Sequence, residues 1–241
     1  GFNYVYFTCL PGTYSIASMT VYIEASDGKY YKYEKTSKDG TSMTFSNEEF
    51  KNINVNMNGV TRTPILKPGA AYYELETASA SNLLTDGTPY IIVYNNQYAF
   101  KPILNGTSYK EDASNCVSVE IIQDKIESDE TTDACQVTFA ATTTSGSYKI
   151  TAVTANSPLY ISSSSINTDN TAVTISKGSE YTIQGEKSGN YTYYLRYSSS
   201  SKLFQHSRTN SSNSFQLYKL ADSREAQTPT FEKSEDEYDI A

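Results

Sequence analysis

The chain has 241 residues, of which 38% are hydrophobic and 19% charged, so it can bury a sizeable core in one large or two modest domains and is neither fibrous nor wholly disordered. Its net charge of −8, without any cluster of Lys and Arg, argues against a nucleic-acid partner. Its 22 tyrosines, single histidine and lack of tryptophan indicate a β-rich extracellular protein with few groups for proton transfer near neutral pH.

A β-hairpin is predicted within the first 35 residues. Residues 19–25 alternate between two faces, and Asp27 with Gly28 forms a tight-turn signal that leads into the strand-like residues 29–33. Residues 2–8 are strand-like as well. Residues 53–58 alternate apolar side chains with Asn, which predicts a half-buried sandwich strand.

A domain boundary is predicted near residue 66. Residues 61–69 hold two prolines and a glycine, the composition of an interdomain linker. Before it, residues 46–50 begin like a capped helix, but no apolar stripe follows, so at most one helical turn is expected there. The expected domains are residues 1–65, a β-sandwich-like domain, and residues 66–220, a small β-barrel domain.

The last segment, residues 221–241, is expected to be an acidic tail or linker. Its seven acidic and two basic residues give −5 of the net charge of −8. Residues 228–231 are the main apolar foothold in this segment, so weak packing is expected from Asp222 onward. The acidic run lacks the loop glycine and the spaced oxygen ligands of a calcium site, so it is interpreted as solvated.

The region after residue 66 is dense in short strand-like runs separated by Gly, Ser and Asn. This density predicts a barrel or a sandwich with short strands. The runs are residues 72–77, 90–94, 97–104, 116–122, 136–142, 148–153, 159–163, 172–176, 181–186, 193–197, 203–206 and 215–219.

A Tyr-x-Ile echo runs through this region and favours a trefoil-like barrel built from three units, with another closed or sandwich β-domain as the alternative. The echo begins at Tyr90, Tyr148 and Tyr181, and each start is followed by an aromatic run and then by an alternating run. The aromatic runs are residues 98–100, 159–161 and 194–197, and the alternating runs are residues 117–119, 173–175 and 215–217.

The three cysteines do not form a disulfide scaffold. Cys9, Cys116 and Cys135 are odd in number and none belongs to a CxxC pair. Cys116 and Cys135 each open a strand-like run, so the alternatives are one bridge between them or two small buried hydrophobic side chains. One histidine and three scattered cysteines do not supply a structural zinc shell, and neither a metal nor a cofactor is expected.

Short motifs in both domains resemble those of surface proteins from Bacteroides-type bacteria. The first domain resembles the closing strands of a fimbrillin-like domain at residues 10–14 (Leu-Pro-Gly-Thr-Tyr), at the turn around Asp27 and at residues 52–57. The second domain resembles one that is common in secreted proteins of the same bacteria. Its motifs are residues 86–94, 193–204 and 215–220.

The resemblance implies an exported, lipid-anchored surface protein with an adhesive or assembly role. No apolar run reaches the roughly 18 residues of a membrane helix, so a lipid anchor or export signal is expected upstream of Gly1. A fimbrillin-like domain is about twice as long as residues 1–65, so either its first half is missing or this domain is a smaller relative. A missing half would leave an accessible sheet edge, expected beside residues 3–10 or residues 30–33.

Catalytic signals are weak. His206 lies on an alternating run and is interpreted as an exposed polar side chain, and there is no G-x-S-x-G motif for a nucleophile. Glu120 and Asp124 are the nearest pair of carboxylates for glycoside hydrolysis, and a solvated strand end explains them. The protein is therefore expected not to be an enzyme.

Tyrosine offers a flat apolar face and a hydroxyl, which suits recognition of glycans and proteins, although it also fills β-cores. In residues 193–197, Tyr194 and Arg196 share one face of a strand, while Leu195 lies on the other. If Leu195 points inward, Tyr194 and Arg196 form the exposed pair and the candidate ligand-binding residues.

The sequence thus predicts a noncatalytic protein of the extracellular space or outer cell surface. Its expected partner is a surface glycan, a protein, or another copy bound through a sheet edge. The alternative is an extracellular hydrolase or its accessory binding part.

Overall fold

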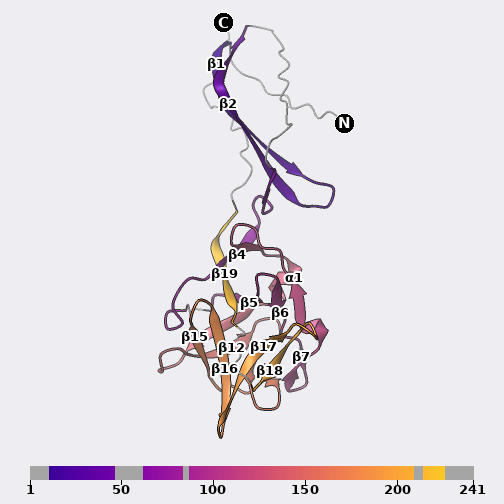
Figure 1. The fold of residues 1–241 in the computed structure, drawn as a ribbon, viewed down its shortest axis with the longest axis vertical. Helices are drawn as coiled ribbons and strands as arrows, with labels where there is room; N and C mark the ends of the chain where they lie inside the picture. Colours follow the sequence, from indigo (N-terminus) through magenta and orange to yellow (C-terminus); the bar gives the residue numbers. More distant parts are fainter. Residues whose placement is uncertain (1–10, 47–61, 84–86, 209–213, 226–241) are drawn as a thin grey trace. The chain divides into compact units, whose positions relative to one another are not determined.

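The computed structural model of the chain describes residues 11–46, 62–83, 87–208 and 214–225 (Figure 1). The chain divides into two compact domains, Gly1–Ile65 and Leu66–Ala241. Strands make up 54% and helices 4%, so the predicted all-β class is confirmed.

The described part of the first domain is a three-stranded antiparallel sheet with the order β1-β2-β3. Its strands are β1 (Gly12–Glu24), β2 (Tyr30–Phe45) and β3 (Arg62–Ile65). The predicted hairpin is confirmed, with Tyr30 opposite Glu24. In its turn, Gly28 has a φ of +78°, a conformation that glycine adopts without the strain of a Cβ. Ile23 and Tyr22 are 41% and 38% exposed, so adjacent residues on both faces of this strand reach solvent.

The interpretation of residues 61–69 as a linker is wrong for residues 62–65. These residues form β3 and pair with Tyr30–Tyr33, whose other side pairs with β1. The accessible edge expected at Tyr30–Tyr33 is therefore wrong, because β3 covers it. Pro64 is tolerated because β3 has β2 as its one partner among the described residues, and proline is compatible with an outer strand. The edge expected beside residues 3–10, the strand at 53–58 and the helical turn at 46–50 lie outside the described residues.

The described part of the second domain is one 16-stranded sheet with two short helices. Each of the twelve predicted runs overlaps a strand. The strands are β4 (Ala71–Leu75), β5 (Tyr90–Tyr94), β6 (Tyr98–Phe100), β7 (Leu104–Asn105), β8 (Ser108–Tyr109), β9 (Cys116–Ser118), β10 (Lys125–Glu127), β11 (Val137–Ala141), β12 (Ser147–Ala152), β13 (Ser157–Ile161), β14 (Ile166–Asn167), β15 (Val173–Lys177), β16 (Tyr181–Ser188), β17 (Tyr191–Ser198), β18 (Leu203–Ser207) and β19 (Gln216–Arg224). The helices are η1 (Ala113–Asn115) and α1 (Glu130–Asp133).

Six of these strands pair in a circular order, β5–β11–β12–β15–β16–β19 and back to β5. The link between β16 and β19 is a bridge from Tyr181 to Phe215, the residue before β19. Outside the circle, β6 pairs with β9, β13 with β14, and β17 with β18. The chain thus runs through three successive units, each with two strands in the circle and two outside it, and β4, β7, β8 and β10 are additional to this pattern. This is the order of pairings that a trefoil-like barrel requires.

The sequence echo places the first two strands of each unit correctly and misplaces one of the last. Tyr90 and Tyr181 are the first residues of β5 and β16, and Tyr148 is the second residue of β12; these are the first strands of the three units. The echo at residues 117–119 overlaps β9, a third strand, whereas the last strand of that unit is β11. The misplacement arises because β10 and α1 are inserted between β9 and β11, which also makes the gaps between the echoes unequal.

The main core lies inside the circle and contains aromatic side chains from all three units. Tyr90 meets Phe139 edge to face, with 5.1 Å between ring centroids, and Phe100 meets Phe204 at 5.3 Å. A second, smaller core lies on the opposite face of β5, where Ile91 packs with residues of β4, β10 and β19. Both faces of β5 are therefore buried, which explains why its sequence is apolar throughout instead of alternating.

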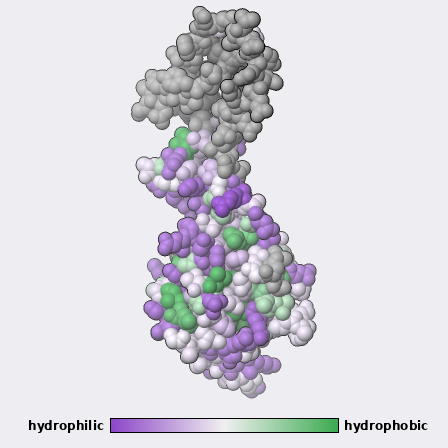
Figure 2. Space-filling model, turned by 180° about the vertical axis from the view of Figure 1, so that it is seen from behind, coloured by the Kyte–Doolittle hydropathy of each residue, from purple (hydrophilic) through white to green (hydrophobic). Residues whose placement is uncertain are grey.

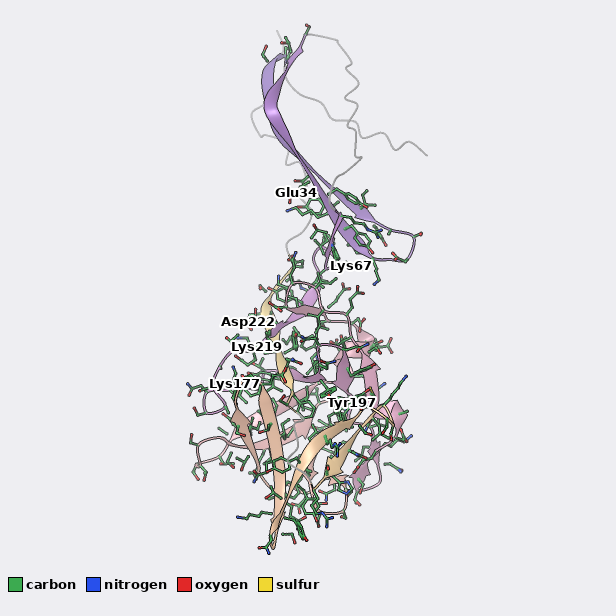
Figure 3. The ribbon with its side chains drawn as sticks, viewed as in Figure 1. Glu34, Lys67, Lys177, Tyr197, Lys219 and Asp222 are labelled. Atoms are coloured by element: carbon green, nitrogen blue, oxygen red, sulfur yellow. The ribbon has the colours of Figure 1, made fainter. Side chains whose placement is uncertain are left out.

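A cap segment, residues 76–83, lies across one end of the circle. The three tyrosines that open the units all donate their hydroxyl hydrogen bonds to it, and Leu83 is buried in the main core. Lys177, labelled in Figure 3, donates to the Thr77 and Ala78 carbonyls. The tyrosine bonds are Tyr90 to Glu76 Oε2 (3.3 Å), Tyr148 to the Ala80 carbonyl (2.8 Å) and Tyr181 to the Ala78 carbonyl (2.5 Å).

The acidic tail begins later than residue 221. Strand β19 continues to Arg224, which pairs with Ala71, and the Glu225 carboxylate accepts a hydrogen bond from Lys125 Nζ at 2.9 Å. The pairing with β4 keeps residues 221–224 in the sheet despite their polar side chains. Residues 222–224 are thus held in the sheet by their backbone while their side chains are exposed, and residues 226–241 lie outside the described part of the chain.

Candidate functional site

Strand β17 separates its side chains as the alternation predicts. Leu195 and Tyr197 are buried, at 1% and 4% exposure, and Tyr194 and Arg196 lie on the other face, where both are half-buried. Leu195 therefore points inward, which is the condition under which Tyr194 and Arg196 form an accessible pair. Their role in binding is still a prediction.

Pairing with β16 and β18 adds polar neighbours to this pair. Tyr194 is directly opposite Gln184 on one side and Ser207 on the other, and Arg196 is opposite Gln205. Residues opposite each other in antiparallel strands project to the same side of the sheet. We refer to these five side chains, Gln184, Tyr194, Arg196, Gln205 and Ser207, as the β17 face. All five are half-buried.

Strand β16, which contributes Gln184 to the β17 face, passes very close to β13. The register between β16 and β17 shifts between Gln184 and Lys187, which places Gly185 in an irregular stretch opposite Tyr193. A Cβ at Gly185 would overlap the Ile161 carbonyl and lie 2.6 Å from the Ile161 Cβ. Glycine is therefore required where β16 passes β13, and bulges of this kind re-aim neighbouring side chains.

Aromatic stacking fixes β17 from the inner side. The ring of Tyr197, labelled in Figure 3, lies between those of Tyr94 and Tyr98, with centroid distances of 4.7 and 5.0 Å and near-parallel planes. Burial raises the pKa of Tyr197 above its usual range, so this ring remains neutral under ordinary conditions. The β17 face thus lies on a strand whose inner side is packed against another unit.

The single histidine is paired with a carboxylate that the sequence analysis did not single out. His206 Nδ1 lies 2.8 Å from Glu111 Oε2, and the same carboxylate accepts the backbone N–H groups of His206 and Ile166 at 3.0 and 2.8 Å. Glu111 thereby connects β18 to β14. No sequence motif marks this contact, because 95 residues separate the two side chains.

The other expected pair of acids, Glu120 and Asp124, lies around a tight turn. Ile122 bridges to Lys125, and the two residues between them have positive φ, with 58° at Asp124. This geometry agrees with the interpretation of these acids as part of a strand end.

The two described cysteines are free thiols. Cys116 is half-buried and Cys135 is buried, so no bridge joins them, and burial raises the pKa of the Cys135 thiol to about 12. Cys9 lies outside the described residues. Within the described ranges, no group of three or more His, Cys, Asp or Glu side chains is arranged to hold a metal ion.

Comparison with protein-family models, with curated proteins and with solved structures finds no match to this chain. Among the residues that the structure describes, no helix is long and apolar enough to cross a membrane. Figure 2 shows one side of the molecule, on which hydrophilic and neutral residues cover most of the described surface and hydrophobic ones are scattered.

Proposed function

We propose that the chain is a noncatalytic binding protein that acts outside the cell or on its outer surface, where the β17 face recognises a glycan or a protein. The observation that carries this proposal is the separation of side chains along β17, with Leu195 and Tyr197 anchored in the core and Tyr194 and Arg196 half-exposed. A half-exposed Tyr beside Arg combines a flat apolar surface with a planar cation, and both are enriched where proteins bind partners.

The proposal of a noncatalytic role is supported by the way the acids and the histidine are used. The Glu111 carboxylate binds two backbone amides as well as His206, so its contacts connect strands. The buried Glu76 carboxylate likewise accepts from the backbone N–H of Ala78 at 2.7 Å within the cap segment. A structural hydrogen bond accounts for each of these groups.

The test is a binding screen of the full chain against immobilised glycans and against proteins of a host surface. The double variant Tyr194→Ala with Arg196→Ala is expected to lose at least tenfold in affinity. Tyr191→Ala is the matched control, because Tyr191 is a 53% exposed tyrosine on the opposite face of the same strand, and it should bind as the unchanged chain does. Equal binding by the double variant would disprove the role of the β17 face, and release of sugar from a bound glycan would disprove a noncatalytic role.

Self-association through a sheet edge is a second candidate. Within residues 11–46 and 62–65, β1 pairs on one side only, with β2, and unpaired backbone groups along a strand can accept another strand. Light scattering over a range of concentrations tests this candidate, which requires dimers or larger species to form as the concentration rises. A mass that stays monomeric at all concentrations contradicts it.

A further inference from the structure

The three units of the second domain allow the β17 face to be compared with two equivalent positions in the same chain. Counting from the tyrosine that opens each unit, the fourth residue is Val93, Thr151 or Gln184. Their cross-strand partners are Ala99, Pro158 and Tyr194, respectively. Ala99 and Pro158 are therefore the counterparts of Tyr194.

Neither counterpart offers an aromatic side chain to solvent. Ala99 is fully buried in the second core, on the face of β5 and β6 that packs against β4 and β10. Pro158 lies in β13, where its carbonyl accepts a hydrogen bond from Tyr109 at 2.9 Å. The third unit alone therefore presents a Tyr-Arg pair at this position of the described second strands.

The counterparts of Arg196, two residues further along, also differ. They are Lys101 in the first unit and Tyr160 in the second, and Tyr160 is 9% exposed. The first unit thus has a cation without the tyrosine, and the second has a mostly buried tyrosine without the cation. The combination of a flat ring and a planar cation occurs once.

The charged side chains that β16, β17 and β18 contribute to the β17 face are cationic. Lys187 lies opposite Thr192 and extends the face along the hairpin of β16 and β17, so that Arg196 and Lys187 are both on this side. Among the described residues of β16 to β18 that project to this side, none is Asp or Glu. Glu186 lies in the irregular stretch of β16, and its carboxylate accepts the Ser163 N–H at 2.6 Å. This local cationic character contrasts with the chain's net charge of −8.

The dimensions of the face suit a short ligand. Two strand spacings of about 4.8 Å separate Gln184 from Ser207, and Tyr194 and Arg196 are two residues apart, which is about 7 Å along a strand. Amide groups of Gln pair with hydroxyls, a tyrosine ring contacts the apolar face of a sugar, and the guanidinium fork matches a carboxylate. A few sugar rings would cover the face.

We infer that the β17 face is a single site per chain for the end of a glycan that carries a carboxylate, such as a uronic acid or a sialic acid. This inference rests on the proposed function and narrows it in ligand class and in number of sites. Glycans with neutral ends, although they can contact Tyr194, lack the group that Arg196 would bind in a bidentate manner.

Calorimetric titration of the full chain with two matched pairs of probes tests the inference. The pairs are an oligosaccharide ending in glucuronic acid against the same oligosaccharide ending in glucose, and sialyllactose against lactose. The acidic member of at least one pair is expected to bind about tenfold more tightly, with one site per chain, and to weaken as salt rises.

Variants separate the contributions of the two residues. Arg196→Lys keeps the charge but removes the planar fork, so it should lose most of the preference for the acidic probe while retaining binding to the neutral probe. Tyr194→Ala should lose binding to both. Lys149→Gln, at an exposed cation on β12, is the control and should change neither.

Each outcome decides between the inference and the broader proposal. Equal affinity for acidic and neutral probes, lost together in Tyr194→Ala, would disprove the ligand class and leave the proposed function intact. Two or three sites per chain, of which Tyr194→Ala removes one or none, would disprove the single site. Failure of every acidic probe to bind would overturn the inference, and a protein partner captured through Tyr194 would still support the proposed function.

Discussion

At the scale of single residues, Asn115 connects two segments that are far apart in the sequence. It is fully buried, its amide donates to the carbonyls of Phe204 and Lys110 at 2.6 and 2.8 Å, and its Oδ1 accepts the Phe204 N–H at 2.9 Å. One side chain thus provides hydrogen-bond partners for both the backbone N–H and the backbone C=O of the buried Phe204. Together with Glu111, it connects the segment between β8 and β9 to β18.

We expect Asn115→Ala to lower the free energy of unfolding by about 2–4 kcal/mol, because the Phe204 N–H and C=O would be left buried without partners. Urea titration monitored by circular dichroism measures the effect. Ser114→Ala is the control, since Ser114 is exposed and its loss should cost about 0.5 kcal/mol or less. Equal stability of the two variants would show that Phe204 finds other partners.

At the scale of strands, Gly185 sets how closely β16 can approach β13. Gly185→Ala would place a Cβ against the backbone of Ile161, and backbone in a packed core cannot move aside at low cost. We expect a loss of several kcal/mol (about 3 or more) or failure to fold, measured by soluble yield and thermal unfolding. Gly178→Ala should be tolerated, because nothing lies within 4 Å of a Cβ there and no left-handed φ is involved.

The sequence predicted the long strands of the second domain because their apolar side chains alternate or run continuously, as in β5 and β12. It did not predict β8 and β14, which have two residues each and too short a pattern to recognise. It also misinterpreted β3, because Pro64 signals a break whether or not the strand is an outer one. Local pattern thus predicts a strand's existence, but its partners depend on contacts made elsewhere.

The same limit applies to the candidate site. Alternation around Leu195 was sufficient to assign Tyr194 and Arg196 to one face. The neighbours Gln184 and Gln205 depend on cross-strand register, which a single strand does not encode. The contact between His206 and Glu111 depends on how the segment between β8 and β9 packs against β18, so nothing near either residue in the sequence indicates it.

At the scale of the whole molecule, buried tyrosines make the stability of the folded chain decrease at alkaline pH. Burial raises the pKa of Tyr109, Tyr181 and Tyr218 to about 12 in the folded chain, against 10.0 as the ordinary value. Because the folded pKa is the higher one, these hydroxyls support the folded state fully below pH 10, and their contribution is lost as the pH rises through about 12.

We therefore expect unfolding to set in above about pH 10 and tyrosine ionisation to occur in two phases, exposed rings first and buried rings together with unfolding. Absorbance of tyrosinate and circular dichroism, recorded over the same pH range, measure the two events. A single phase of ionisation near pH 10 with the circular dichroism unchanged would contradict the assignment of these rings to the core.

The pairing of β4 with β19 also affects how the chain can be made. Glu74 pairs with Lys219, so β4, the first strand of the second domain, cannot pair with β19 until this last strand is present. Strand β5, which follows β4, also pairs with β19. A ribosome or an export channel delivers the chain from its N-terminus, so the earlier strands remain without a closing partner until residues near 224 have emerged. Contacts this distant in sequence form slowly. The second domain should therefore fold only after the whole chain has emerged, and fragments that end before residue 216 should remain unfolded and be degraded.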